Sequence, residues 1–188
     1  AELEKIGALC REHGAFAYTD EIYEYIVYDG RHHVSMASLE SCRDLTITIS
    51  GFSKTFSITG WRIGYVTAPA DVARGIGLVN DLLYVCAPTP LQHGVARGLD
   101  VDADYYRDMS ADYQAKRDML AAALRDAGMS PLVPDGAYYM LADVTELGFS
   151  GAREAADALL AEAKVASVPG TAFYASGGGD QLLRFCFA

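Results

Sequence analysis

Apolar residues recur at helical spacing in several stretches of the chain. Leu3, Ile6 and Leu9 follow this spacing and predict a first helix, which Gly14 ends. The longest stretch carries Tyr106, Met109, Tyr113, Leu120 and Leu124 along one stripe, with Gly128 as its stop. The same reasoning predicts helices over residues 72–83, 91–99, 103–127 and 152–163.

Short apolar runs separate these helices and predict strands. Residues 45–49 are the best example, because they read Leu-Thr-Ile-Thr-Ile, a compact β-branched run. Further strands are expected at residues 15–19, 63–68, 138–143, 165–168 and 182–187. Short apolar strands that alternate with helical or loop segments favour an α/β fold with a mostly parallel, buried sheet.

The long helix over residues 103–127 divides the chain into two regions. Residues 1–100 hold the α/β pattern, and residues 101–188 hold the long helix followed by strands and one more helix. The second region therefore resembles a smaller α+β unit joined to the first by the long helix. We expect two domains with these boundaries.

Composition and charge exclude several classes of protein. Of 188 residues, 51% are hydrophobic, so the chain can bury a real core and is not a disordered tail. The net charge of −10 argues against nonspecific binding to nucleic acid or to an anionic membrane. No apolar run approaches the roughly 18 residues that a membrane helix needs. We expect neither a nucleic-acid partner nor a membrane partner.

The cysteines and histidines do not form a metal-binding pattern. Cys10, Cys42, Cys86 and Cys186 are scattered, without a Cys-x-x-Cys pair, and are interpreted as buried thiols in a reducing compartment. This interpretation predicts a cytoplasmic protein. The pair His32-His33 has no cysteine or acidic cluster beside it, so no metal site is expected.

The segment with the clearest chemical content is SGFSKTFSITGWRIG, residues 50–64. Its lysine, Lys54, comes just after a predicted strand, and ligands of open α/β sheets bind at strand ends. Desolvation or a nearby cation can make such a lysine a nucleophilic amine. Arg62 and the hydroxyls suit a phosphate group. The segment is not a Walker loop, because Ser53 stands where that motif needs glycine.

This segment resembles the lysine signature of the class I/II pyridoxal-phosphate-dependent aminotransferases, which have fold type I. The resemblance implies that Lys54 is the Schiff-base lysine, that Arg62 binds the cofactor phosphate, and that Ser50 or Ser53 adds a further phosphate contact. Many relatives have serine where this chain has Gly51. The matching positions are Gly51, Phe52, Ser53, Lys54, Ser57, Ile58, Gly60, Trp61, Arg62, Ile63 and Gly64.

Three more segments are similar to the same family, in the same order. Residues 20–23 (DEIY) resemble its Asp-x-x-Tyr, which implies that Asp20 contacts the pyridine nitrogen and Tyr23 the 3′-oxygen. Residues 134–139 and 168–173 resemble turns of its small domain. Residues 183–188 (LRFCFA) resemble the strand whose arginine, here Arg184, binds the substrate α-carboxylate.

The resemblance covers the whole chain but only about half of a family member. It implies that residues 1–100 are the C-terminal part of the cofactor-binding large domain and residues 101–188 the small domain, with both ends truncated. The chain also opens inside a predicted helix and lacks an initiator Met. The 188-residue chain alone is therefore expected to be inactive.

The function implied by the resemblance is pyridoxal 5′-phosphate-dependent transamination between an L-amino acid and a 2-oxo acid, through a Schiff base on Lys54. The implied assembly is a homodimer. Two alternatives stay open: a carbon–sulfur β-lyase of the same fold, and the aminotransferase-like effector domain of a transcription regulator. The residues leave the identity of the amino acid open.

Overall fold

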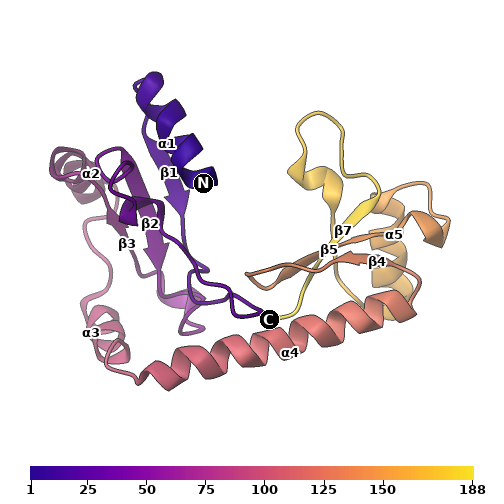
Figure 1. Ribbon diagram of the computed structural model, residues 1–188. Coiled ribbons are helices and arrows are strands. Elements are labelled where there is room, and N and C mark those ends of the chain that lie inside the picture. Colours follow the sequence, from indigo (N-terminus) through magenta and orange to yellow (C-terminus); the bar gives the residue numbers. More distant parts are fainter. The chain divides into compact units, whose positions relative to one another are not determined.

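Two units, each with its own sheet, make up the chain in the computed structural model, which describes all 188 residues (Figure 1). The first unit comprises Ala1–Tyr25 and His32–Tyr106, and the second comprises Ile26–Arg31 and Arg107–Ala188. The boundary therefore lies inside the long helix α4 (Ala103–Asp126) rather than before it. Residues 26–31, a short segment between two parts of the first unit, belong to the second unit; this segment is called the excursion.

The sheet of the first unit is mixed. Its strand order is β1 (Ala17–Asp20), β2 (Thr46–Gly51) and β3 (Gly64–Thr67). β1 and β2 are parallel, as expected, whereas β3 runs antiparallel to β2, so the predicted α/β fold is confirmed and its sheet is mixed. The physical reason is the connection over residues 52–63, which holds only turns and a 3₁₀ helix. A parallel return usually runs through a crossover α-helix, which this connection lacks.

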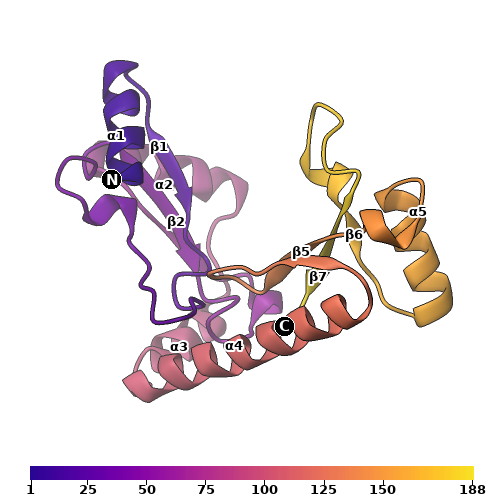
Figure 2. The same ribbon diagram turned by 45° about the vertical axis from the view of Figure 1, so that its right-hand side comes forward.

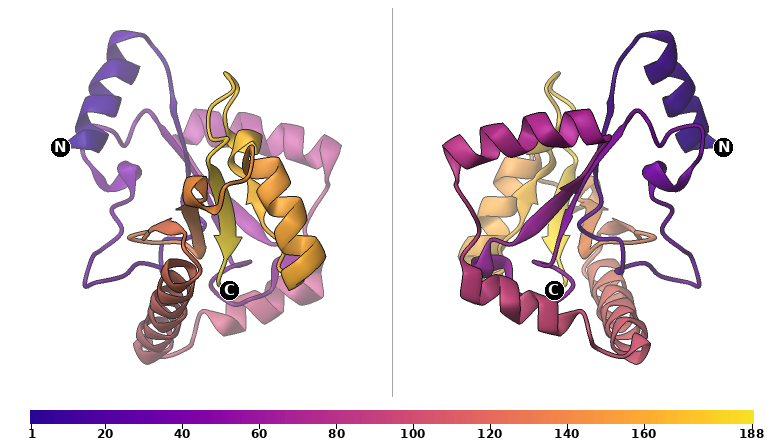
Figure 3. Two further views of the ribbon diagram at one scale, coloured as in Figure 1. Left: turned by 90° about the vertical axis from the view of Figure 1, so that its right-hand side faces the viewer. Right: turned by 90° about the vertical axis from the view of Figure 1, so that its left-hand side faces the viewer.

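The helices of the first unit lie close to their predicted positions: α1 (Glu2–Glu12), α2 (Ala70–Leu83) and α3 (Thr89–Gly98). α1 packs closely against the core residue Cys42. A side chain at Gly7 of α1 would clash with the sulfur of Cys42. Figure 3 shows α2 crossing the direction of the strands. The last turn of α2 is apolar and uncovered, with Leu82 84% and Leu83 81% exposed.

The second unit has an antiparallel sheet in the order β4-β5-β7-β6. Figure 2 shows α5 beside β6 and β7. Met140, Ala142, Leu183 and Phe185 share one face of β5 and β7 and are buried, while Arg184 shares the other face with Leu141. The bounds are β4 (Ser130–Leu132), β5 (Tyr139–Asp143), β6 (Val168–Pro169), β7 (Leu182–Cys186) and α5 (Ala152–Ala158), which continues as a π-helical turn (Leu159–Ala163).

Four short 3₁₀ helices lie in the connections, at Met36–Ser38, Thr59–Trp61, Thr145–Leu147 and Gly170–Phe173.

The expectation of buried thiols holds for Cys42 and is wrong for Cys86 and Cys186, which are exposed. Cys186 is exposed because it lies on the open face of the second sheet, the face that carries Arg184. None of the helices combines the length and the apolar character that crossing a membrane requires.

A buried arginine attaches the excursion to the second unit. Arg117 on α4 is 4% exposed, and its two terminal nitrogens lie 2.7 and 3.1 Å from the Asp29 carboxylate. The same guanidinium donates to the carbonyl of Pro134 and lies 4.8 Å from the ring centroid of Tyr28. The hydrogen bond to Asp29 raises the pKa of Arg117 further above its ordinary value, so the group is always charged. This network explains why residues 26–31 belong to the second unit.

Candidate active site

Lys54 lies in a tight turn directly after β2. The turn is closed by the amide of Phe56, which donates to the carbonyl of Phe52 at 3.0 Å, and by the amide of Ser57, which faces the carbonyl of Lys54 at 3.4 Å. Ser57 has a left-handed φ of 54°, and the 3₁₀ helix Thr59–Trp61 follows. The lysine is half-buried at the carboxyl end of the strand. The structure thus places it where the sequence predicted, at a strand end.

Gly51 and Gly64 let the two strands approach each other closely beside Lys54. A Cβ on Gly51 would lie 2.9 Å from the Cα of Gly64, and a Cβ on Gly64 would lie 2.9 Å from the carbonyl oxygen of Ser50. Side chains at either position would push β2 and β3 apart. The glycine at position 51, the one departure from the family signature, therefore matches the geometry of this chain.

Asp20 lies at the same edge of the sheet as Lys54. β1 and β2 are parallel, with Asp20 opposite Ile49, so their carboxyl ends meet. The exposed Asp20 carboxylate accepts a hydrogen bond from the amide of Ile22 at 3.2 Å, which starts the turn that carries the half-buried Tyr23. The structure brings Asp20, Tyr23 and Lys54 to one edge of the first sheet.

Glu21 is a buried carboxylate that the sequence analysis did not single out. It is 7% exposed and lies 2.9 Å from Nε2 of His33, 3.1 Å from the hydroxyl of Ser35 and 3.0 Å from that of Thr19. Burial raises the pKa of Glu21, but the hydrogen bonds from His33, Ser35 and Thr19 outweigh burial and hold the pKa below its ordinary value of 4.5. The only sequence signal was its place beside Asp20 at a strand end.

Replacing Glu21 by glutamine is expected to destabilise the protein at neutral pH and to make less difference in acid. The carboxylate has a lowered pKa in the folded state, so its contribution is present above pH 4.5 and is lost as the pH falls through the folded pKa. Urea unfolding between pH 3 and 7 measures the difference, with the exposed Glu12 replaced by glutamine as the control. A difference that does not change with pH would contradict this assignment.

The two candidate serines have different surroundings. Ser50 is 4% exposed, and its hydroxyl lies 3.0 Å from the Glu24 carboxylate and 3.3 Å from the Glu21 carbonyl. Tyr65 donates to the same Glu24 carboxylate at 3.3 Å, and burial raises the pKa of Tyr65. Ser50 is thus part of an internal network. Ser53 is half-buried, one residue before Lys54.

Arg62 closes the turn that begins at Lys54. It has a left-handed backbone, with φ 55° and ψ 44°, and its Nη1 donates to the carbonyl of Thr59 at 3.1 Å. The Thr59 hydroxyl in turn donates to the carbonyl of Ser53 at 3.3 Å. The side chain of Arg62 is exposed and therefore accessible to an anion.

Aromatic rings support this turn from within the first unit. Phe52 stacks on Phe56 with centroids 6.1 Å apart and contacts Tyr65 at 5.6 Å. A cavity of about 220 Å³ lies beside them. Packing of this kind fixes the backbone that carries Lys54.

Arg184 belongs to the second unit, at the centre of β7. Its guanidinium carbon lies 4.2 Å from the ring centroid of Tyr139 and 4.6 Å from that of Phe173. These residues, with Leu141 and Tyr174, line a cavity of about 390 Å³. Neither aromatic residue was a candidate from the sequence, although both lie in segments that resembled the family.

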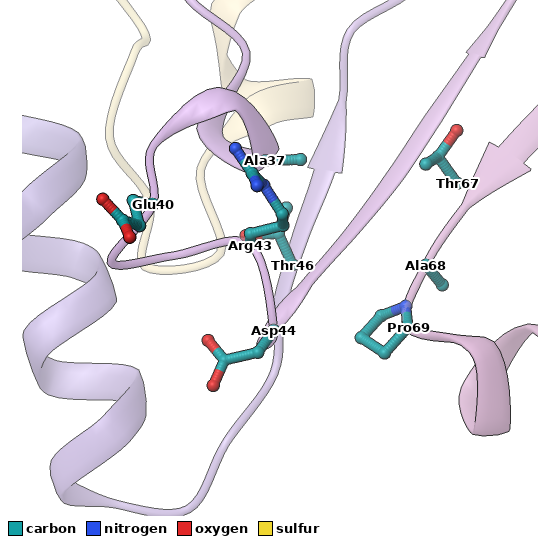
Figure 4. Close-up of a pocket in the computed structure, with 8 residues that line it drawn as sticks. All are labelled: Ala37, Glu40, Arg43, Asp44, Thr46, Thr67, Ala68 and Pro69. Atoms are coloured by element: carbon teal, nitrogen blue, oxygen red, sulfur yellow. The ribbon is translucent and has the colours of Figure 1, made fainter.

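A larger cavity, of about 550 Å³, lies at the opposite end of the first sheet, where β2 begins and β3 ends (Figure 4). Figure 4 shows Glu40, Arg43 and Asp44 on one side of it and Thr67 and Pro69 on the other. It is remote in the sheet from Lys54, and its size alone does not make it the reaction site. No group of three or more His, Cys, Asp or Glu side chains that could hold a metal ion occurs in the chain.

Comparison with known proteins gives one consistent result. The sequence matches the family described as "Aminotransferase class I and II" over residues 1–188. It is 33% identical to kynurenine–oxoglutarate transaminase 3 of Rattus norvegicus and 35% identical to aromatic-amino-acid aminotransferase 2 of Thermococcus litoralis. These matches cover 99% and 100% of this chain but 45% and 48% of the relatives. The chain therefore spans about half the length of the curated relatives it matches.

The fold gives the same result. The solved structure of N-succinyldiaminopimelate aminotransferase from Mycobacterium tuberculosis superposes with a TM-score of 0.93 at 32% identity. The superposition covers 99% of this chain and 49% of that one. Sequence and fold thus point to the same family.

Proposed function

Because this chain belongs to the class I and II aminotransferase family, we propose that the protein containing it transfers an amino group between an L-amino acid and a 2-oxo acid. The observation that carries the proposal is Lys54, placed by a family-matching turn at the carboxyl edge of β2 beside the end of β1. The relatives named above are aminotransferases, which favours transamination over a β-lyase or a regulator.

The residues at this edge fit pyridoxal 5′-phosphate, the cofactor of this family. Lys54 supplies an amine and Asp20 a carboxylate. The guanidinium of Arg62 and the hydroxyl of Ser53 can bind a phosphate. Ser53 is proposed over Ser50, because the Ser50 hydroxyl is buried against Glu21 and Glu24. The proposal keeps Tyr23 as the contact of the 3′-oxygen.

Each residue then has one task in the reaction. The bound cofactor supplies an electron sink for negative charge at the substrate Cα. Lys54 Nζ removes the proton from Cα and holds it for return, as general base and acid. The Asp20 carboxylate keeps a proton on the ring nitrogen by pairing with it. Arg184 binds the substrate carboxylate and so orients the Cα–H bond.

We also propose that the protein is a homodimer, as the family resemblance implies. The uncovered apolar turn of α2, with Leu82 and Leu83, supports a further interface, within the subunit or between subunits. Sedimentation of the full product of the gene at the mass of two chains is the expected result.

The proposed function is tested by turnover. The full product of the gene, with added pyridoxal phosphate, is expected to convert an amino acid and 2-oxoglutarate into a 2-oxo acid and glutamate. The 188-residue chain alone is expected to show no turnover, because it spans about half of the relatives and leaves apolar surface on α2 uncovered. Equal rates for the two proteins would contradict this second expectation.

The same assay separates the alternatives. Release of pyruvate and ammonia from a cysteine conjugate without a 2-oxo acid would favour the β-lyase. Glutamate formation that requires both substrates would favour the aminotransferase. Binding of amino acid without either product would favour the regulator.

A further inference from the structure

Arg184 is half-buried between two aromatic rings, and its guanidinium has no acidic partner. Arg11, Arg97 and Arg117 each pair with a carboxylate, whereas the guanidinium of Arg184 contacts only the rings of Tyr139 and Phe173. In a chain with net charge −10, acidic partners are plentiful. The N–H groups of Arg184 are therefore available to an anion that enters the cavity.

Three elements bring the rings to the guanidinium. Arg184 on β7 is directly opposite Leu141 on β5, so Tyr139, two residues earlier on β5, lies diagonally on the same face. Phe173 ends the 3₁₀ helix that follows β6, and Val168 of β6 pairs with Arg184 on the other side. This arrangement is built by the sheet and does not depend on a flexible loop alone.

The start of the Phe173 turn is closely packed. A Cβ on Gly170 would lie 2.3 Å from the carbonyl of Gly179 and 2.8 Å from the Cβ of Leu182. Gly170 can therefore not carry a side chain without displacing backbone. The turn that carries Phe173 is therefore held against Leu182, the first residue of β7, the strand that carries Arg184.

We propose that Tyr139 and Phe173 are positioning residues that hold the Arg184 guanidinium by cation–π contact, so that its N–H edge is ready for a carboxylate. This proposal rests on the proposed function only in taking that carboxylate from the substrate. Contact with ring faces attracts the cation without using its in-plane donors, which remain free for two parallel hydrogen bonds. Holding the long side chain in place also reduces the rotamer freedom lost when the anion binds.

The competing explanation is that the rings are only an apolar wall for the substrate. The two explanations differ for a pair of probes of equal shape, 3-phenylpropanoate and its amide. A wall contributes equally to both probes, whereas a positioned guanidinium favours only the carboxylate. Neither probe carries an amino group, so neither is a substrate for transamination.

The experiment measures equilibrium dissociation constants of both probes by calorimetry on the full product of the gene, loaded with pyridoxal phosphate. Phe173→Leu and Tyr139→Leu are expected to weaken binding of the carboxylate by about 2- to 30-fold, the range of a cation–π contact, and to leave the amide unchanged. Tyr139→Phe keeps a ring and should restore carboxylate binding. Phe149→Leu, an aromatic outside this cavity, is the control.

A double-mutant cycle completes the test. In an Arg184→Met background, Phe173→Leu should no longer affect carboxylate binding. Equal weakening of acid and amide, or an unchanged effect of Phe173→Leu in that background, would overturn the inference. If the acid-specific effect is found in a protein that does not transaminate, the positioning role stands and the proposed function fails. If transamination is found without that effect, the proposed function stands and the positioning role of Tyr139 and Phe173 fails.

Discussion

Replacing Lys54 by alanine is expected to abolish multiple-turnover transamination by the full product of the gene. Loss of proton transfer alone costs about 10²–10⁴-fold in rate, and loss of the covalent attachment adds to it. Lys54→Arg should fail in the same way, because a guanidinium keeps the charge but cannot act as an amine nucleophile. The rate of glutamate formation, with both substrates saturating, measures the effect.

The other lysines provide the control. Lys116 pairs with Asp112 at 2.8 Å on α4, and Lys164 donates to the carbonyl of Ala161 at 2.7 Å. Neither lies in the turn after β2, so Lys116→Ala and Lys164→Ala should keep the rate of the unmodified protein. Full turnover by the Lys54→Ala protein would show that this lysine has no part in the reaction.

Replacing Arg117 by alanine is expected to give the largest loss of stability, about 2–4 kcal/mol in the free energy of unfolding. The change removes hydrogen bonds to Asp29 and to the carbonyl of Pro134, together with the packing of a buried side chain on Tyr28. Asp29→Asn should cost less, because the asparagine oxygen can still accept a hydrogen bond from Arg117 and the Asp118 carboxylate stays 2.8 Å from the guanidinium.

Urea unfolding followed by circular dichroism measures this loss. Arg97→Ala is the matched control, because Arg97 forms a salt bridge with Asp100 at 2.7 Å but is 85% exposed. Exposed pairs of this kind contribute little, about 0–1 kcal/mol. An Arg117→Ala protein as stable as the Arg97→Ala protein would show that the excursion over residues 26–31 is held by other contacts.

The helices and most strands could be predicted because their signals are local. Gly14 and Gly128, both with positive φ, end α1 and α4 where the pattern stops. The direction of β3 could not be predicted, because an apolar run has the same pattern in a parallel and an antiparallel strand. β4 was missed because it is only three residues long and contains a proline.

The candidate site also has parts that the sequence predicts and parts that it does not. Lys54 and Arg62 lie in one continuous segment, so their pattern was visible in the sequence. The partners of Glu21 and Arg184 come from distant segments that only folding brings together. Arg117 occupies a position of the helical stripe between Tyr113 and Leu120, and its charge concealed that it is buried.

Chemical labelling of the active lysine tests the assignment of Lys54 most directly. Borohydride reduction of the full product of the gene with bound pyridoxal phosphate, followed by proteolysis and mass spectrometry, is expected to find the pyridoxyl group on Lys54. Recovery of the label on Lys5, Lys116 or Lys164 instead, with Lys54 unmodified, would show that Lys54 is not the lysine that binds the cofactor.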